Sequence, residues 1–167
     1  MPRECGPPLR ANRDTSKPDL YIPIGLPASG KSTWATTVKH HVICPDTYRQ
    51  QVYGTERPLN GLISKYEGEV WRWAYAQLNE QQRERQHLIF DATNLSPSRR
   101  TRLRNLAPRH NHVAVFFDTP LELCLARNAT RRYPVPQQVI EQMHERMQPP
   151  SHAEKFDDIW LVTPGGK

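Results

Sequence analysis

The sequence predicts an α/β fold in which a parallel central sheet of about five strands is flanked by helices on both faces. Three observations support this prediction. Short apolar runs alternate along the chain with segments whose apolar residues recur at helical spacing. The runs end at a glycine, an aspartate or another turn-forming residue. A length of 167 residues suits one domain with one core, and alternating strands and helices form a parallel sheet covered on both sides.

Each expected element follows from a local pattern. The five apolar runs predict strands at Leu20–Ile24, His41–Cys44, Leu88–Phe90, Val113–Phe117 and Ile159–Val162. The first four helices are expected at Ser32–Lys39, Asp46–Val52, Leu62–Arg85 and Ser96–Leu106, the last with Ser96 as its cap and Pro97 in its first turn. Pro120 opens a further helix, and a final helix carries Val139, Ile140, Met143 and Met147 on one face. Between these two helices, Tyr133-Pro134-Val135-Pro136 must break the helical conformation. The composition of Gly54–Gly61 predicts a loop.

Composition limits the class of protein. Residues 1–18 lack apolar periodicity and predict a flexible basic tail, which leaves residues 19–167 as the folded domain. Three well-separated cysteines and no apolar run long enough for a signal peptide or a membrane span favour a soluble protein of the reducing cytoplasm, with no membrane partner. The net charge of +6 suits a nucleic-acid partner and equally suits a solvated basic surface whose only anion is a nucleotide.

The strongest motif is Gly25–Ser32, which fits the phosphate-loop pattern G-x-x-x-x-G-K-[ST] at every fixed position. It follows a predicted strand and opens a predicted helix, as the motif requires. Backbone amides of the loop and the helix N-terminus bind phosphates, the lysine neutralises the β- and γ-oxygens, and the serine hydroxyl ligates Mg²⁺. The residues that we expect to bind the nucleoside triphosphate are Gly25, Pro27, Ala28, Ser29, Gly30, Lys31, Ser32 and Thr33.

Carboxylates follow the second and third predicted strands. Asp46 lies just after the second, and the carboxyl ends of parallel strands share one edge with the phosphate loop, so Asp46 suits a general base for an acceptor hydroxyl. Helix capping explains the same residue equally well and is compatible with that role. Asp91 ends the third strand, where a carboxylate commonly supports Mg²⁺, although a strand-end turn also favours aspartate.

Two arginines precede the proline-rich break. Arg127 and Arg131 lie four residues apart on a predicted helix and therefore share a face. Guanidinium groups before such a break are typical of a mobile lid that closes over a phosphate. An arginine-rich helix end in solvent, stabilised by the helix dipole, is the alternative.

These blocks together resemble a known family. The segments GLPASGKSTWA, CPDTYRQQV, FDATNLSPSRR and FFDTPLELCLARNATRRYPVPQQVIEQMHERM are similar, in order and spacing, to the 5′-hydroxyl kinase domain of bacteriophage and bacterial end-healing polynucleotide kinases, within the P-loop NTPase superfamily. The resemblance covers most of residues 20–147. Cys44-Pro45 departs from the polar pair usual before the base, and the phosphatase and ligase signatures are missing, so end healing would need separate partners.

The resemblance implies a role for each matched residue. Asp46 would be the general base, Lys31, Arg127 and Arg131 would act on the donor phosphates, and Ser32 with Asp91 would hold Mg²⁺. The implied acceptor-binding residues are Arg49, which contacts a phosphate, Val135, which packs on the terminal base, and Asp91, Thr93 and Asn94. The implied activity is ATP- or NTP-dependent phosphorylation of the 5′-hydroxyl of DNA or RNA. Two alternatives stay open: a kinase of a small molecule or nucleotide sugar, of zeta-toxin or antibiotic-phosphotransferase type, and a nucleotide-binding module without transfer.

Overall fold

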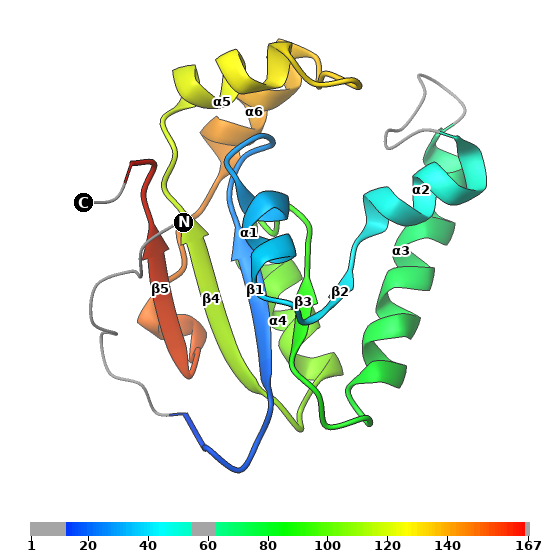
Figure 1. The fold of residues 1–167 in the computed structure, drawn as a ribbon, viewed down its shortest axis with the longest axis vertical. Helices are drawn as coiled ribbons and strands as arrows, with labels where there is room; N and C mark the ends of the chain where they lie inside the picture. Colours follow the sequence, from blue (N-terminus) through cyan, green and yellow to red (C-terminus); the bar gives the residue numbers. More distant parts are fainter. Residues whose placement is uncertain (1–12, 55–62, 166–167) are drawn as a thin grey trace.

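A five-stranded, wholly parallel sheet organises the protein. The computed structural model describes residues 13–54 and 63–165. Its strands run in the order β2-β3-β1-β4-β5, so that β1, which leads into the phosphate loop, is central. The strands are β1 (Asp19–Ile24), β2 (His41–Ile43), β3 (Leu88–Phe90), β4 (Asn111–Phe117) and β5 (Asp158–Val162). The predicted sheet is thereby confirmed (Figure 1).

Helices cover both faces of the sheet and its carboxyl edge. They are α1 (Lys31–Thr37), α2 (Pro45–Tyr53), α3 (Ile63–Gln81), α4 (Pro97–Leu106), α5 (Leu121–Ala129) and α6 (Gln137–Arg146), with a 3₁₀ turn η1 (His152–Glu154). Helix α1 lies in front of the sheet in Figure 1, α4 lies behind it, and α5 and α6 lie above the carboxyl ends of the strands. None of the helices in the described ranges is both long and apolar enough to cross a membrane.

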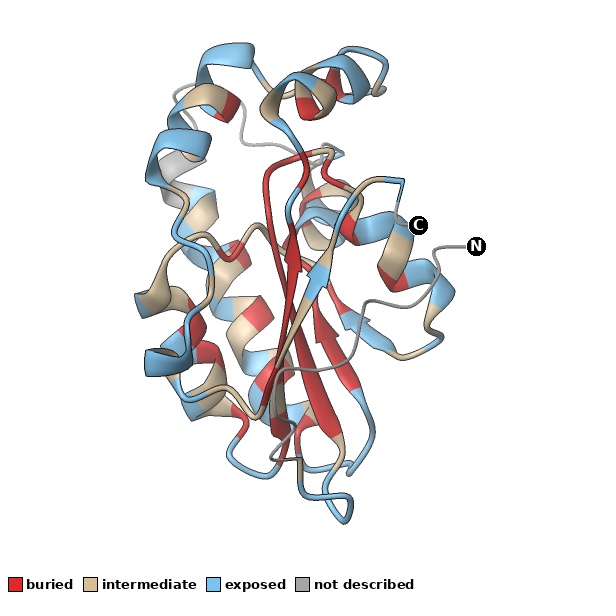
Figure 2. Ribbon diagram, turned by 90° about the vertical axis from the view of Figure 1, so that its left-hand side faces the viewer, coloured by how far each residue is buried: buried red, intermediate tan, exposed pale blue. Residues whose placement is uncertain are grey.

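The core divides according to the alternation of side chains along each strand. On one face, Leu20, Ile22 and Ile24 of β1 pack with apolar residues of α3 and α4. On the other, Tyr21 packs with β4 residues and Trp34 of α1. Figure 2 shows the central strands buried, whereas the edge strands β2 and β5 have exposed or intermediate positions and buried positions on the helices are few.

Helices α5 and α6 belong to a separate small cluster. Cys124 of α5 and Ile140 of α6 are fully buried together with Leu26 of the phosphate loop. This unit, residues 121–146, which we call the lid, therefore rests on the phosphate loop rather than on the central core.

Several boundaries differ from the expectation for physical reasons. The long helix ends at Gln81, not at Arg85, because the polar residues after Leu78 have no apolar group to bury, and Arg85 adopts a left-handed conformation at φ +52°. The predicted start of that helix at Leu62 and most of the loop at 54–61 lie outside the described residues. Strand β4 begins two residues early because Asn111 and His112 pair with Asp19 and Leu20 of β1.

The described part of the predicted tail also differs from a flexible segment. Arg13 forms ion pairs with Asp19 and Asp158, and the amide of Asp14 donates to the side chain of Asn111 at 2.9 Å. These contacts join Arg13 and Asp14 to the amino ends of β1, β4 and β5.

Candidate active site

The phosphate loop is a tight turn between β1 and α1 that only small residues fit. Gly30 has φ +109°, which L side chains rarely adopt. At Gly25 the constraint is contact: a Cβ there would lie 2.8 Å from Ser29 Oγ and 3.0 Å from Phe117 Cβ. The two fixed glycines of the motif thus have separate reasons, one conformational and one steric.

Neighbouring strand ends hold the loop in place. The amide of Gly25 donates to the carbonyl of Thr93 at 3.1 Å, and Thr119 Oγ1 donates to the carbonyl of Ser29 at 3.0 Å. Thr93 follows β3 and Thr119 follows β4, so the loop is fixed from both flanking strands. Rigid positioning of the loop amides is what electrostatic stabilisation of phosphates requires.

Lys31 is buried at the base of this loop. Its Nζ donates to the carbonyls of Gly25 at 3.0 Å and Leu26 at 2.6 Å, and to Ser29 Oγ at 3.3 Å. Burial lowers the pKa of Lys31 to about 8, although the negative charges of Asp91 and Asp46 oppose this shift. An anion bound in the loop would restore the missing negative charge and favour the protonated lysine.

Asp91 and Ser32 form a pair of oxygen groups beside Lys31. The Ser32 hydroxyl donates to the Asp91 carboxylate. Burial raises the pKa of Asp91, and that hydrogen bond together with the charges of Lys31 and Arg131 opposes the rise. Within residues 13–54 and 63–165, no cluster of three or more His, Cys, Asp or Glu is placed to hold a metal ion. One carboxylate and one hydroxyl fit Mg²⁺, which usually keeps waters and substrate phosphates as its other ligands.

Helices α2 and α3 carry residues that the sequence predicts to act on an acceptor, and we call this part of the site the acceptor wall. Asp46 lies in the first turn of α2 with its side chain 53% exposed and pairs with Arg49 one turn later. Arg49 is buried, and its guanidinium donates to Glu67 of α3 through Nε at 2.5 Å and Nη2 at 2.7 Å. Although burial alone would lower it, the hydrogen bond to Glu67 and the nearby carboxylates leave the pKa of Arg49 raised. Trp71 Nε1 donates to the same Glu67 at 3.2 Å.

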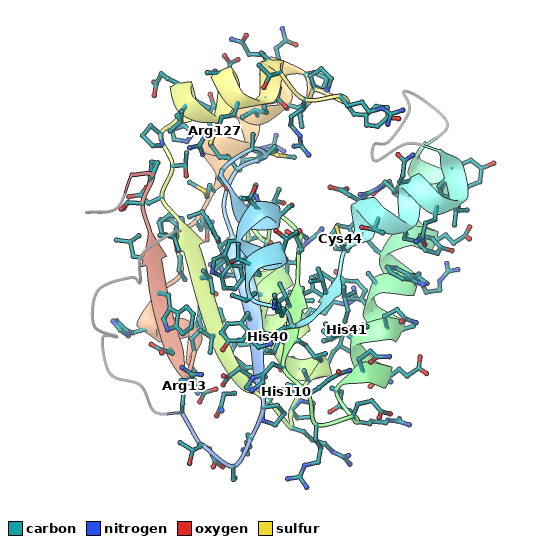
Figure 3. The ribbon with its side chains drawn as sticks, viewed as in Figure 1. Arg13, His40, His41, Cys44, His110 and Arg127 are labelled. Carbon is teal, nitrogen blue, oxygen red and sulfur yellow. The ribbon has the colours of Figure 1, made fainter. Side chains whose placement is uncertain are left out.

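An internal clamp shapes the lid. The buried side chain of Asn128 accepts from the amide of Val135 at 2.8 Å and donates to its carbonyl at 2.8 Å. This reciprocal pair closes the segment that carries Arg131. Figure 3 shows Arg127 on α5 and Cys44 at the start of α2, on different sides of the phosphate loop.

One cleft of about 940 Å³ unites these parts, a volume that suits a nucleotide. Most of the site residues predicted from the sequence line it: Pro27, Ala28, Ser29, Gly30, Lys31, Ser32, Thr33, Asp46, Asp91, Thr93, Arg127, Arg131 and Val135. Two aspartates and two arginines that are distant in sequence therefore converge on the phosphate loop.

Three predicted residues lie behind the cleft wall. Gly25 is buried beneath the loop. Arg49 is tied to two carboxylates rather than presented to the cleft. Asn94 differs most from the expected acceptor contact: it is fully buried, and its amide donates to the carbonyls of Pro23 at 2.8 Å and Phe90 at 3.1 Å. Asn94 thus fixes the loop after β3, which its left-handed φ of +47° also helps to turn.

Sequence reasoning missed several residues of the site. Glu67 has no local signal, because the helical pattern alone does not say which of its polar residues faces α2. Asn128 lies in the last of the four segments that resemble the polynucleotide kinases, but the sequence indicates no role for it. Also missed were cleft-lining residues from α1, α6 and the end of β5: Trp34, Thr37, Val139, Met143, Val162, Thr163, Pro164 and Gly165. The end of β5 is recognisable as a site only after the strand order places it beside β4.

Known proteins share this arrangement. The model of the AAA domain family (AAA_33) matches residues 20–150. The L-seryl-tRNA(Sec) kinase of Methanococcus maripaludis is 27% identical over 157 residues, which cover 86% of this chain and 59% of that kinase. The chain thus spans less than two thirds of that relative's length.

Solved structures show the same fold at lower identity. A chain of the Pnkp1/Rnl/Hen1 RNA repair complex is similar with a TM-score of 0.67 and 23% identity, over 81% of this chain and 45% of that one. The APS kinase CysC of Mycobacterium tuberculosis, in complex with AMPPNP and APS, has a TM-score of 0.61 and 19% identity. This match covers 90% of this chain and 91% of that one. The chain belongs to the AAA domain family.

Proposed function

We propose that this protein is an ATP-dependent polynucleotide kinase that transfers the γ-phosphate of ATP, or of another nucleoside triphosphate, to the 5′-hydroxyl end of DNA or RNA. The observation that carries the proposal is that Asp46 lines the same cleft as the phosphate loop and the lid arginines, but from the wall formed by α2. A carboxylate opposite the donor phosphates is what an acceptor hydroxyl needs for deprotonation.

In the proposed reaction, Asp46 accepts the proton of the 5′-hydroxyl while the oxygen of that hydroxyl attacks the γ-phosphorus. The new oxygen–phosphorus bond forms as the bond between the γ-phosphorus and the bridging oxygen breaks, and ADP leaves. Lys31 and Arg131 offset the charge of the moving phosphoryl group, with Arg127 beside them. Ser32 and Asp91 would hold Mg²⁺, which when bound supplies further charge neutralisation on the phosphate oxygens.

The remaining residues have supporting roles in this proposal. Val135 lines the cleft from the lid, where an apolar side chain suits packing against the terminal base of the acceptor. Arg49, held by Glu67, orients the Asp46 carboxylate through their ion pair. This role replaces the phosphate contact that the resemblance implied, because both sides of the Arg49 guanidinium already meet carboxylates.

Support for a nucleic-acid acceptor comes from the relatives and from charge. One relative is named as an L-seryl-tRNA(Sec) kinase, and one structural neighbour belongs to an RNA repair complex. The net charge of +6 is compatible with a polyanionic partner. Separate phosphatase and ligase partners for end healing are part of the same proposal.

A seryl-tRNA acceptor is the second candidate, because the L-seryl-tRNA(Sec) kinase match spans 86% of this chain. The same carboxylate would then deprotonate a serine hydroxyl. A small-molecule acceptor is the remaining alternative.

The test is transfer of label from γ-labelled ATP to three acceptors: a 5′-hydroxyl oligonucleotide, seryl-tRNA and a mixture of sugars and nucleosides. We expect label on the 5′ end of the oligonucleotide, lost with Asp46→Asn and retained with Asp118→Asn. Asp118 is an exposed carboxylate at the end of β4 that does not line the cleft. Label on seryl-tRNA or on a small molecule alone would overturn the polynucleotide assignment.

A further inference from the structure

Two arginines of α4 lie over aromatic rings of α3. The guanidinium carbon of Arg99 lies 3.9 Å from the ring centroid of Trp71, and that of Arg102 lies 4.1 Å from that of Tyr75. Both aromatic rings stack in turn on Phe90, which is fully buried, at centroid distances of 6.3 and 6.1 Å. The two cation–aromatic pairs are therefore fixed to the core, and we call them the arginine ladder.

The charges of the arginine ladder are not balanced locally. Helix α4 contains four arginines and no acidic residue. Arg100 is fully buried and paired with Glu154, but over residues 13–54 and 63–165 no carboxylate lies within ion-pair distance of Arg99 or Arg102. Stacking uses the flat face of a guanidinium and leaves its N–H groups at the edge free to bind a phosphate.

A chain of direct contacts connects the ladder with the proposed base. Arg99 stacks on Trp71, Trp71 donates to Glu67, Glu67 accepts from Arg49, and Arg49 pairs with Asp46. The ladder thus begins at the acceptor wall of the cleft. Tyr75 is one helical turn beyond Trp71, or about 6 Å along α3, so the second rung leads away from the cleft.

We propose that the arginine ladder binds the sugar–phosphate backbone of a single-stranded nucleic acid whose 5′ end lies in the cleft. Successive phosphates would bind the edges of the Arg99 and Arg102 guanidinium groups, and a base can stack on the outer face of each. This inference rests on the proposed function, which supplies the 5′ end at Asp46. A single strand is favoured over a duplex because one 5′ terminus alone must enter a cleft roofed by the lid.

The experiment compares the full chain with the double variant Arg99→Gln/Arg102→Gln. Binding of a 3′-labelled 5′-hydroxyl oligonucleotide of about 20 nucleotides is measured by fluorescence anisotropy from about 50 to 200 mM salt. Two lost phosphate contacts should reduce the slope of log affinity against log salt by about 1.4. The variant Arg83→Gln/Arg109→Gln removes the same charge from exposed positions near the other end of the sheet and should leave the slope unchanged.

Transfer assays separate this inference from the proposed function. The KM of the double variant should rise about tenfold for the long oligonucleotide and stay within about twofold for a dinucleotide, which is too short to reach the ladder. Thermal unfolding checks that the variant folds, and Arg99→Lys/Arg102→Lys should restore most of the salt slope. An unchanged slope, an equal loss in the control variant, tighter binding of a duplex, or no binding of a single strand by the wild type would each overturn the proposal. Ladder-dependent binding without any transfer would instead refute the proposed function and leave the ladder in place.

Discussion

The donor and acceptor halves of the cleft are built in different ways. On the donor side, one continuous segment from β1 to α1 supplies the phosphate loop, in which the proposed function assigns binding to backbone amides and Lys31. On the acceptor side, the geometry depends on side chains from different helices, with Asp46 and Arg49 on α2 held by Glu67 on α3. A site built from backbone amides tolerates substitution at its variable positions. The paired side chains of Glu67, Arg49 and Asp46, which we call the relay, fail when any one of them is replaced.

The first prediction tests whether the two halves are separable. Asp46→Asn should reduce kcat by about 10²–10⁴-fold, because the amide accepts no proton from the acceptor, while ATP affinity stays within about twofold. Single-turnover transfer and equilibrium nucleotide binding measure the two effects, with Asp118→Asn as the matched control. Normal turnover by Asp46→Asn would remove Asp46 from the role of base.

A second prediction concerns the lid. Asn128→Ala removes both hydrogen bonds to the partly buried backbone amide and carbonyl of Val135, so Arg131 should lose its position. We expect kcat to fall by up to about 10²-fold, with little change in the melting temperature because the lid forms its own small cluster. Asn79→Ala, at an exposed position of α3, is the control. A large fall in melting temperature with unchanged kcat would show that the clamp serves stability alone.

The third prediction tests the relay. Glu67→Gln keeps the shape but weakens the charge-assisted bonds to Arg49, which should lower kcat about tenfold and leave ATP affinity unchanged. Glu80→Gln, exposed at the far end of α3, should have no effect. If Glu67→Gln instead lowers the KM of the acceptor with unchanged kcat, Arg49 contacts the acceptor phosphate, as the family resemblance implies.

The last prediction concerns pH, where the effect near neutrality is the smallest of the four. Because burial lowers the pKa of Lys31 to about 8 and bound phosphates raise it again, ATP binding above about pH 8 must take up a proton. Affinity should therefore fall by at most about tenfold per pH unit as pH rises from about 8 to 10, and be nearly constant below about 7. Calorimetry in buffers of different ionisation enthalpy measures the proton uptake. Lys31→Arg, which stays charged, should bind more weakly but without this pH dependence.

The same contrast explains which parts of the fold and of the site could be predicted from the sequence. The phosphate loop and the sheet were predictable because each depends on residues that are neighbours in the chain. Glu67 was not, since nothing local distinguishes it from Glu69, and only the packing of α2 on α3 selects it. Four arginines and no acidic residue on α4 would suggest a solvated helix, yet Arg100 is fully buried because it lies one turn before Leu103 on the inward face of α4. Asn94 was expected to contact the acceptor because, in a sequence, a polar residue after a strand looks the same whether its side chain binds a ligand or the backbone.

Arg100 also determines where this domain can be cut. Its guanidinium donates to the carbonyls of Asn94 and Gln148 and forms a double hydrogen bond with Glu154. The family match stops at residue 150, four positions before that carboxylate. A protein truncated there would keep every matched residue and still fold poorly, because a permanent charge would be stranded in the interior. The 3₁₀ turn η1 and strand β5 are therefore integral to the domain, even though the recognisable family pattern ends before them.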